Sequence, residues 1–350
     1  MKPEAEKPAS KALVTGVVLF YLVAALAMVM ANKWVLNITD TPLFFLWTQL
    51  AIAALLFIIC DLFRALPDRL TFDWQTSKQM VAVVGLNVIG LSFSNYTLKY
   101  VDASFYQVAR GLVLPFTVAV SFVVLHSRPS LKVLGACGMV TFGFFIGVFL
   151  DGTPVSTLGI FFGVASSAIT AVHSVVIKRS LGAVNGSALA LSWYMNSLSA
   201  VVLFPIVLLL GEGPGIVKLL FNVNELAVAP GTMSPLKTFI WGSFITGVLG
   251  FLMNIASLLS IKVTSPITHM VSSAVRGVAA SLLGMWLFHD IITTGRASSI
   301  ATILAGSALY TWFKHKESQT SSHNASDRRG SYERVKMEDI EAAAESKAKP

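Results

Sequence analysis

Long apolar stretches separated by short polar breaks run along most of the chain. Ten of these stretches approach the roughly 20 residues that a helix needs to cross the hydrocarbon core of a bilayer. They lie near residues 13–33, 42–63, 78–98, 103–126, 131–150, 155–177, 187–210, 237–260, 266–289 and 297–313. We expect each to form one membrane-spanning helix. The predicted fold class is therefore an all-α membrane protein with ten transmembrane helices.

The breaks between the stretches carry turn-forming residues. Proline or glycine stands close to a short polar residue at 40–42, 151–154, 185–186 and 265–266, and such combinations favour turns. The pattern predicts one ten-helix domain over 13–314, preceded by a short N-terminal segment over 1–12. Residues 315–350 are rich in Ser, Lys, Glu and Ala. They are predicted to form a disordered tail, because they have too few apolar residues to bury.

Two segments of the chain resemble each other. Lys99 stands 27 residues before His126, and Lys262 stands 27 residues before His289. Each segment reads as a lysine, a short break, an apolar stretch that contains an arginine, and a histidine. The two stretches are the fourth and the ninth, and an offset of five helices inverts one half relative to the other. This predicts two inverted five-helix repeats, over about 13–150 and 155–314, the arrangement from which transporters build alternating access.

Charge is scarce and unevenly placed. The chain is 55% hydrophobic and 13% charged, whereas a soluble domain carries about 25% charged residues. With the N-terminus in the cytosol, eleven lysines and arginines outside the predicted helices fall on the cytosolic side before the tail, and five on the other side. The positive-inside rule then places both termini in the cytosol. The net charge of +8 reflects this topology, and no nucleic-acid partner is expected.

Arg110 and Arg276 lie inside two apolar stretches, about 10 and 15 Å from the helix start at 1.5 Å per residue. A cation at the middle of a membrane helix costs about 2.5–3.5 kcal/mol on insertion scales. No Asp or Glu falls near the middle of any predicted helix. We therefore expect both arginines to face a wet cavity that binds a phosphorylated anion, because the guanidinium fork suits phosphate oxygens. For Arg110, extension of the side chain to the interface stays open.

Other polar side chains accompany the arginines. Tyr194 and Asn196 lie in the seventh stretch, and Ser272 and Ser273 share the ninth stretch with Arg276. They could contact the base or sugar of a ligand, or form hydrogen bonds between helices. Both interpretations stay open. Gly111 and Pro115 near Arg110, and Gly277 beside Arg276, are predicted points of flexibility.

The sequence offers little for catalysis. Cys60 and Cys137 have no partner at metal-ligand or redox spacing, so we interpret them as core thiols. We find no metal cluster, no cofactor motif and no nucleophile–base constellation, and no enzymatic activity is predicted. A membrane-embedded enzyme and a drug exporter are the weaker alternatives. An exporter of cationic drugs would be expected to carry an internal acid.

Several motifs together suggest a family. MANKWVLN, LKYVDASFYQVARGL, ALSWYMNSL and IKVTSPITHMVSSAVRG make the chain resemble the nucleotide-sugar transporters of the drug/metabolite transporter superfamily, the Golgi GDP-fucose transporters most closely. The resemblance implies a multi-pass Golgi membrane protein that imports a nucleotide sugar into the lumen and returns a nucleoside monophosphate. For the sugar GDP-fucose, the returned product would be GMP.

The resemblance also implies roles for individual residues. Related GDP-sugar carriers read guanine with an FYNN stretch, here Trp193 to Asn196, and contact phosphate with a GALNK stretch, here Ser272 to Arg276. Arg276 keeps the positive charge. Met195 and Val275 stand where those carriers have asparagine, so UDP-xylose, GDP-mannose or a sugar phosphate stay open as substrates. The oligomeric state, a homodimer included, is also left open.

Overall fold

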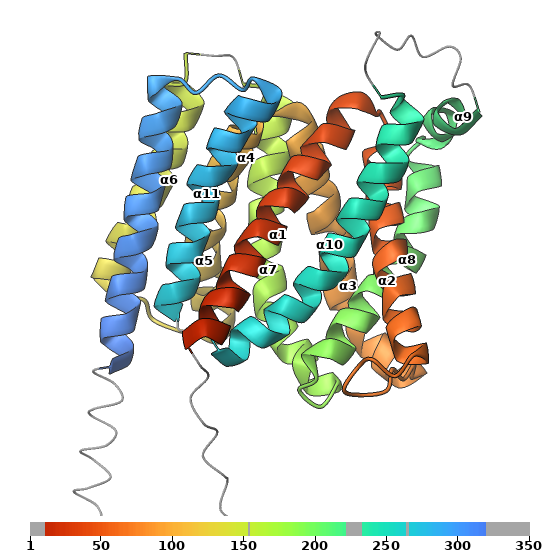
Figure 1. The fold of residues 1–350 in the computed structure, drawn as a ribbon. Helices are drawn as coiled ribbons and strands as arrows, with labels where there is room; N and C mark the ends of the chain where they lie inside the picture. Colours follow the sequence, from red (N-terminus) through yellow and green to blue (C-terminus); the bar gives the residue numbers. More distant parts are fainter. Residues whose placement is uncertain (1–10, 153–154, 222–232, 264–265, 320–350) are drawn as a thin grey trace, which may run out of the picture.

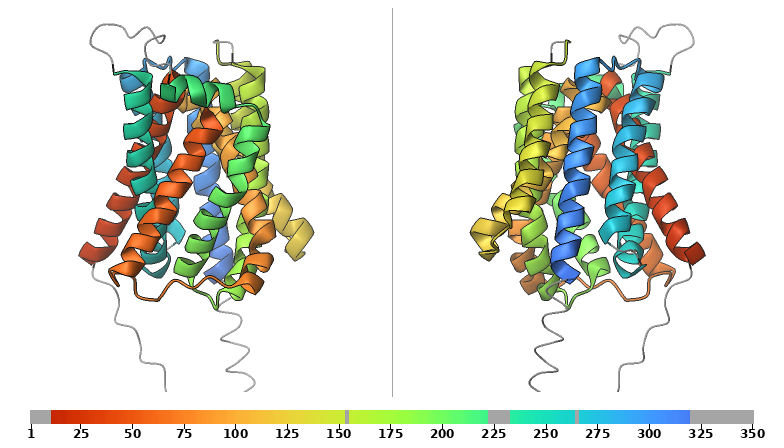
Figure 2. Two further views of the ribbon diagram at one scale, coloured as in Figure 1. Left: turned by 90° about the vertical axis from the view of Figure 1, so that its right-hand side faces the viewer. Right: turned by 90° about the vertical axis from the view of Figure 1, so that its left-hand side faces the viewer.

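The computed structural model describes residues 11–152, 155–221, 233–263 and 266–319 of the chain. Within these ranges the protein consists of α-helices packed side by side, without a β-strand (Figures 1 and 2). The helices are α1 (Lys11–Ile38), α2 (Pro42–Leu62), α3 (Trp74–Tyr100), α4 (Ala103–Gly111), α5 (Val113–Leu125), α6 (Leu131–Phe149), α7 (Thr157–Ala183), α8 (Ala188–Leu209), α9 (Gly213–Phe221), α10 (Pro235–Val263) and α11 (Pro266–Phe288). A further helix over 294–319 is called the last helix below.

Eight segments of the described chain are long and apolar enough to cross a membrane. Seven correspond to the single helices α1, α2, α3, α6, α7, α8 and α10, and the eighth is α4 together with α5. The expected ninth and tenth spans are present as α11 and the last helix, but neither is among these eight. The described chain is thus all-α and has the spans of a multi-pass membrane protein. The count of ten transmembrane helices stays a prediction.

Two elements differ from the sequence pattern. The short helix α9, between α8 and α10, is not predicted by it. The last helix continues to Gln319, so the first five residues of the expected tail are helical. The rest of that tail and most of the N-terminal segment lie outside the described residues.

Lys33 and Arg296 are two of the five cations that the charge count assigns to the non-cytosolic loops, and the structure corrects their placement. Lys33 lies within α1 and is buried, and its Nζ donates to the carbonyl oxygens of Leu98 at 2.9 Å and Val101 at 2.7 Å. Those carbonyls lie at the end of α3, where a helix has unsatisfied acceptors and a partial negative charge. Arg296 lies in the first turn of the last helix and is 2% exposed. Both cations are therefore internal groups rather than topology signals.

Local capping explains where several helices begin. Asp73 precedes α3 and its side chain accepts a hydrogen bond from Thr76 N at 2.8 Å. Serines do the same for α6, α7 and α8, where the residues are Ser130, Ser156 and Ser187. A side-chain oxygen at this position satisfies a backbone N–H that has no partner within the helix. Carboxylate capping also holds the pKa of Asp73 below its ordinary value, through the hydrogen bonds from Thr76.

The start of α2 is capped from a distant part of the chain. Its own N-cap residue, Thr41, makes no side-chain capping bond. Instead, the buried Glu212 accepts hydrogen bonds from Leu43 N at 2.9 Å and Phe44 N at 2.8 Å. Burial raises the pKa of the Glu212 carboxyl, and the two backbone bonds oppose that rise. One carboxylate between α8 and α9 therefore holds the N-terminus of α2.

The fourth apolar stretch is broken at Leu112. Leu112 N bonds to Ala109 O at 3.2 Å, which is an i−3 contact, and α5 begins at the next residue. Pro115 lies one turn after Gly111. Because proline has no N–H, it cannot donate a helical hydrogen bond to the carbonyl oxygen of Gly111. The break thus falls between the two residues predicted as points of flexibility. It separates the nine-residue α4, which carries Arg110, from α5.

The two segments that resemble each other in sequence agree in length and at their C-terminal ends, although the first is broken at Leu112 and α11 is continuous. Ala103–Leu125 and Pro266–Phe288 are each 23 residues long. The histidine that follows each, His126 or His289, has a left-handed backbone with φ of 52° or 56°. In Figure 1 the chain descends through α4 and α5 and ascends through α11, so the two segments run in opposite directions.

Candidate functional site

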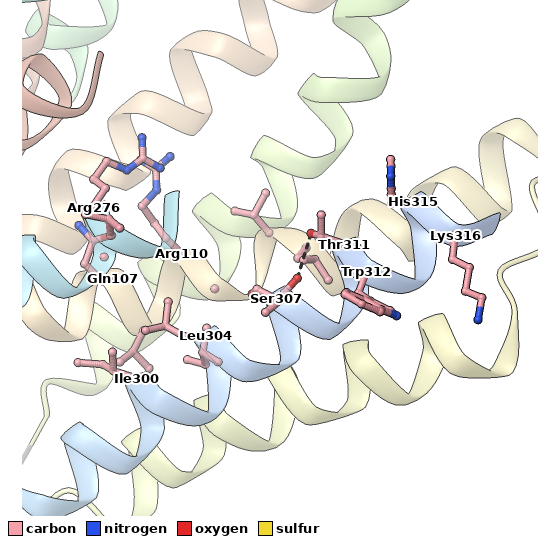
Figure 3. A pocket seen from close by; sticks show the side chains of 18 of the residues that line it. Gln107, Arg110, Arg276, Ile300, Leu304, Ser307, Thr311, Trp312, His315 and Lys316 are labelled. Carbon is pink, nitrogen blue, oxygen red and sulfur yellow. Dashed lines mark hydrogen bonds between the residues drawn. The ribbon is translucent and has the colours of Figure 1, made fainter. Parts of the chain in front are cut away.

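A cavity of about 900 Å³ lies between α4, α5, α11 and the last helix (Figure 3). The last helix contributes one long stripe of residues with spacings of three and four, from Ile300 to Gln319. The deep part of the stripe is apolar, and the part toward the helix end is polar and aromatic. The other helices line the cavity with residues that include Gln107, Arg110, Val275 and Arg276.

Arg110 and Arg276 meet at the deep part of this cavity, where their guanidinium groups point toward one another (Figure 3). Arg110 Nη1 donates to Tyr106 Oη at 3.1 Å, and its guanidinium carbon lies 5.7 Å from the centre of that ring. Tyr106 is 6% exposed, and its hydroxyl lies 2.8 Å from Ser94 Oγ on α3. The head group of Arg110 thus ends on a buried phenol beside the cavity, which argues against its extension to the interface.

Arg276 has a similar polar setting. It interacts with Tyr21 of α1 through a side-chain hydrogen bond, and electrostatically with Tyr106 and Arg110. Arg110 is exposed to the cavity and Arg276 is half-buried, so their repulsion grows where the cavity closes and water is excluded. An anion bound between them would remove that repulsion.

The described residues contain no group of three or more His, Cys, Asp or Glu side chains that could hold a metal ion.

The other predicted site residues lie elsewhere. The Tyr194 hydroxyl accepts a hydrogen bond from Asp73 N at 2.7 Å, and its ring stacks on Phe72 with centroids 5.8 Å apart. Asn196 Nδ2 donates to Ser192 O at 2.8 Å within α8. Neither residue lines the cavity. Their contacts with a substrate stay predictions.

Ser272 and Ser273 lie in α11, but their side chains are outside the described residues. Their expected role therefore also stays a prediction.

Sequence reasoning missed several residues that line or support the cavity. Tyr106 and Gln107 stand four and three residues before Arg110, so helical spacing places them on the same face of α4. Ser307, Thr311 and Trp312 belong to the stripe of the last helix. The whole stripe recurs every three or four residues, and this spacing is visible in the sequence.

Comparison with known proteins agrees with this architecture. The Triose-phosphate Transporter family matches residues 12–311. GDP-fucose transporter 1 of Dictyostelium discoideum is 30% identical over 86% of this chain and 80% of its own length. The Golgi GDP-fucose transporter of Drosophila melanogaster is 30% identical over 86% and 90%. GDP-fucose transporter 1 of Mus musculus is 28% identical over 92% and 88%.

A solved protein structure shares the fold. It covers 88% of this chain and 99% of its own, with a TM-score of 0.52 and 16% sequence identity. Because the family match spans most of the chain, and relatives at 30% identity cover most of their own length, the assignment is clear. The chain belongs to the Triose-phosphate Transporter family.

Proposed function

We propose that this protein is a nucleotide-sugar antiporter that imports GDP-fucose into the Golgi lumen in exchange for GMP. The observation that carries the proposal is the pair Arg110 and Arg276, which face each other across one cavity inside apolar helices. Guanidinium groups bind phosphate oxygens through charge-assisted, often bidentate hydrogen bonds. Three relatives at about 30% identity are named GDP-fucose transporters, which supports this substrate class.

The exchange mechanism follows from the charge of the arginine pair. A diphosphate between the two guanidinium groups neutralises them, whereas an empty occluded state would leave both cations desolvated and close together. The occluded state is then accessible mainly when a phosphorylated ligand is bound. This couples import of the nucleotide sugar to return of the nucleoside monophosphate and prevents leak.

Alternating access is proposed to use ten transmembrane helices in two inverted five-helix repeats. The matching 23-residue segments support this arrangement, because both are followed by a histidine with a left-handed backbone and they run in opposite directions. Both ends of the described chain lie at the same face (Figure 1). With the lysine and arginine bias, this supports a Golgi orientation with both termini in the cytosol.

The remaining space of the cavity suits more than a phosphate. Its volume of about 900 Å³ is near the upper end for sites that enclose drug-sized ligands. Ser307, Thr311 and Trp312, which belong to the stripe of the last helix, lead from the arginines toward the end of that helix. This gives a nucleoside and a sugar both hydroxyl partners and an aromatic surface.

A second substrate is favoured by one observation. Val275 lines the cavity beside Arg276 and is 48% exposed, yet related guanine carriers have asparagine at the matching position. An apolar side chain there cannot donate to or accept from a base. A nucleotide sugar with another base, such as UDP-xylose, or a sugar phosphate is therefore the favoured alternative on the same scaffold. GDP-mannose shares guanine with GDP-fucose, so this observation does not separate the two, and it stays a second alternative.

Counterflow in proteoliposomes tests the substrate directly. Vesicles loaded with GMP, UMP, inorganic phosphate or buffer alone are given labelled GDP-fucose, GDP-mannose, UDP-xylose or a triose phosphate. We expect rapid uptake of GDP-fucose into GMP-loaded vesicles and little uptake into buffer-loaded ones. Equal uptake without an internal nucleotide would contradict antiport. Preference for another combination would reassign the substrate.

Replacing Tyr106 with phenylalanine tests how Arg110 is held. The change removes the hydroxyl that accepts the hydrogen bond from Arg110 and keeps the buried ring. A hydrogen bond to a charged group contributes about 1.5–3 kcal/mol, so we expect kcat/KM for exchange to fall roughly tenfold or more. Tyr310→Phe is the control, since Tyr310 does not line the cavity. Equal activity of both variants would remove Tyr106 from the site.

A further inference from the structure

A buried ion-pair cluster lies at the start of the last helix, away from the polar end of the cavity. Arg296 Nη1 donates to Asp102 Oδ2 at 2.8 Å and to Ser104 Oγ at 2.9 Å. Its Nε donates to Asp151 Oδ2 at 2.7 Å, and Nη2 contacts the same oxygen. The side chain of Asp151 is 1% exposed and that of Arg296 is 2% exposed. One guanidinium thus joins two carboxylates and a hydroxyl. Arg296 and Asp151 are out of contact with solvent, whereas the side chain of Asp102 is 46% exposed.

The cluster connects parts of the chain that are far apart in sequence. Asp102 precedes α4, Asp151 follows α6, and Arg296 begins the last helix. Asp290, which follows α11, accepts a hydrogen bond from Ala103 N at 3.0 Å. Burial, and then the nearby charge of Asp102, raise the pKa of Asp290. The first turn of α4 is therefore held by residues that come from the second half of the chain.

Close backbone packing surrounds these ion pairs. A Cβ on Gly295 would overlap the carbonyl oxygen of Leu150, and one on Gly284 would lie 2.6 Å from Asp290 Oδ2. Ser299, one turn after Arg296, is 0% exposed and donates to the carbonyl oxygen of Gly143 at 2.6 Å. The cavity beside the cluster has a volume of about 70 Å³, against about 900 Å³ at the arginine pair. This end of the bundle is closed.

The closed end and the large cavity lie toward opposite faces. The cavity lining extends along the last helix to Gln319. From Arg296 to Gln319 the helix rises about 35 Å at 1.5 Å per residue, slightly more than the roughly 30 Å of a bilayer core. In Figure 1 the last helix, drawn in blue, crosses the whole height of the bundle.

We propose that the cluster around Arg296 is the gate that closes the face opposite the polar end of the cavity, which lies toward Gln319. The proposal rests on the alternating access of the proposed function. To open this face, Arg296 of the second half must part from Asp102 and Asp151. When the face opens, water enters and hydrates the separated charges. A substitution that removes one partner has a different effect, because the other partner stays buried without a counterion. The gate is therefore stable when closed and can still open.

The short helix α4 links this gate to the anion site. Its first turn carries Ser104, which bonds to Arg296, and its last turn carries Arg110 in the cavity. The break at Leu112 separates α4 from α5, so the nine residues can tilt as one rigid unit. A bound phosphate would draw Arg110 toward Arg276 and so pull on α4. The gate holds the same helix at its other end, through Ser104 and Arg296. Ligand binding and release of the gate are thereby coupled.

Cysteine labelling from the gate face tests the proposal. Ser299→Cys is the reporter, in a protein whose free cysteines Cys60 and Cys137 are replaced by alanine. A membrane-impermeant maleimide is added to vesicles of known orientation, on the face that bears Arg296. Arg296→Met leaves Asp151 without its counterion, and we expect labelling of the reporter to be at least tenfold faster than in the parent.

Matched variants separate gating from folding. Arg69→Met removes an arginine from the exposed ion pair with Asp61 and is expected to leave the labelling rate unchanged. Asp102→Asn keeps the contact between Arg296 and Asp151, and we expect a smaller rise of about threefold, which serves as the test if Arg296→Met does not fold. Unchanged labelling in a folded Arg296→Met or Asp102→Asn variant would overturn the gate. The labelling assay needs no nucleotide. Unchanged labelling would therefore count against the gate only, and the proposed nucleotide exchange would still be tested separately by counterflow.

Discussion

Replacing Arg276 with alanine is expected to abolish nucleotide exchange and leave the protein folded. Arg276 and Arg110 supply the positive charge at the deep part of the cavity (Figure 3). Two charge-assisted hydrogen bonds at about 1.5–3 kcal/mol each are lost with a bidentate guanidinium. We therefore expect kcat/KM in the counterflow assay to fall by about 100-fold or more.

The stability of the same variant distinguishes a binding role from a structural one. Because Arg110 faces Arg276, alanine at position 276 removes a repulsion between like charges. The variant also loses the hydrogen bond between Arg276 and Tyr21, so the melting temperature without ligand should change little. GMP, which should raise the melting temperature of the wild type through binding to the folded state, should have little effect on the variant.

Lysine at position 276 is the matched control. Arg276→Lys keeps the charge but not the planar fork, so it should retain part of the exchange activity and part of the GMP-induced stabilisation. If Arg276→Ala exchanged nucleotide at the wild-type rate, the arginine pair would not be the phosphate site. A large drop in ligand-free melting temperature would instead assign Arg276 a structural role.

The arginine pair could be predicted because its signal is local. A cation inside an apolar stretch is visible in one helix, and its cost in lipid already demands an explanation. The break near Leu112 is similarly local, since Gly111 and Pro115 flank it. Tyr106 was also within reach, because a residue four positions before Arg110 shares its helix face. Local sequence signals thus predicted most of the helices and the two arginines that line the cavity. Their role in binding stays a prediction.

Contacts between distant segments could not be predicted in this way. Arg296 and Asp102 are separated by 194 positions, and Arg296 and Asp151 by 145. Each looks like an ordinary charged residue at a helix end, where charge costs little. Only the convergence of three helix ends brings the three residues together and buries Arg296 and Asp151. Tyr194 is a second example. Its place on the helix indicates that the side chain points inward, but the sequence does not show that its hydroxyl accepts a hydrogen bond from Asp73 N.

Glu212→Ala is expected to destabilise the fold more than any surface substitution. The carboxylate accepts hydrogen bonds from Leu43 N and Phe44 N at the start of α2, and the change leaves both N–H groups without this partner. A lost N-cap costs about 0.5–2 kcal/mol, and a buried donor left unsatisfied costs about 1–3 kcal/mol. We expect the free energy of unfolding to fall by about 2–4 kcal/mol, measured as a drop of several degrees in melting temperature in detergent.

Two further variants define what Glu212 contributes. Glu212→Gln keeps one carbonyl oxygen as an acceptor but loses the charge that favours a helix N-terminus, so its melting temperature should lie between those of wild type and the alanine variant. Asp40→Asn changes a carboxylate that pairs with Lys99 but is 96% exposed, and exposed ion pairs contribute little. It should melt like the wild type. A wild-type melting temperature for Glu212→Ala would mean that the start of α2 does not depend on this carboxylate, and that water or nearby backbone can satisfy its N–H groups equally well.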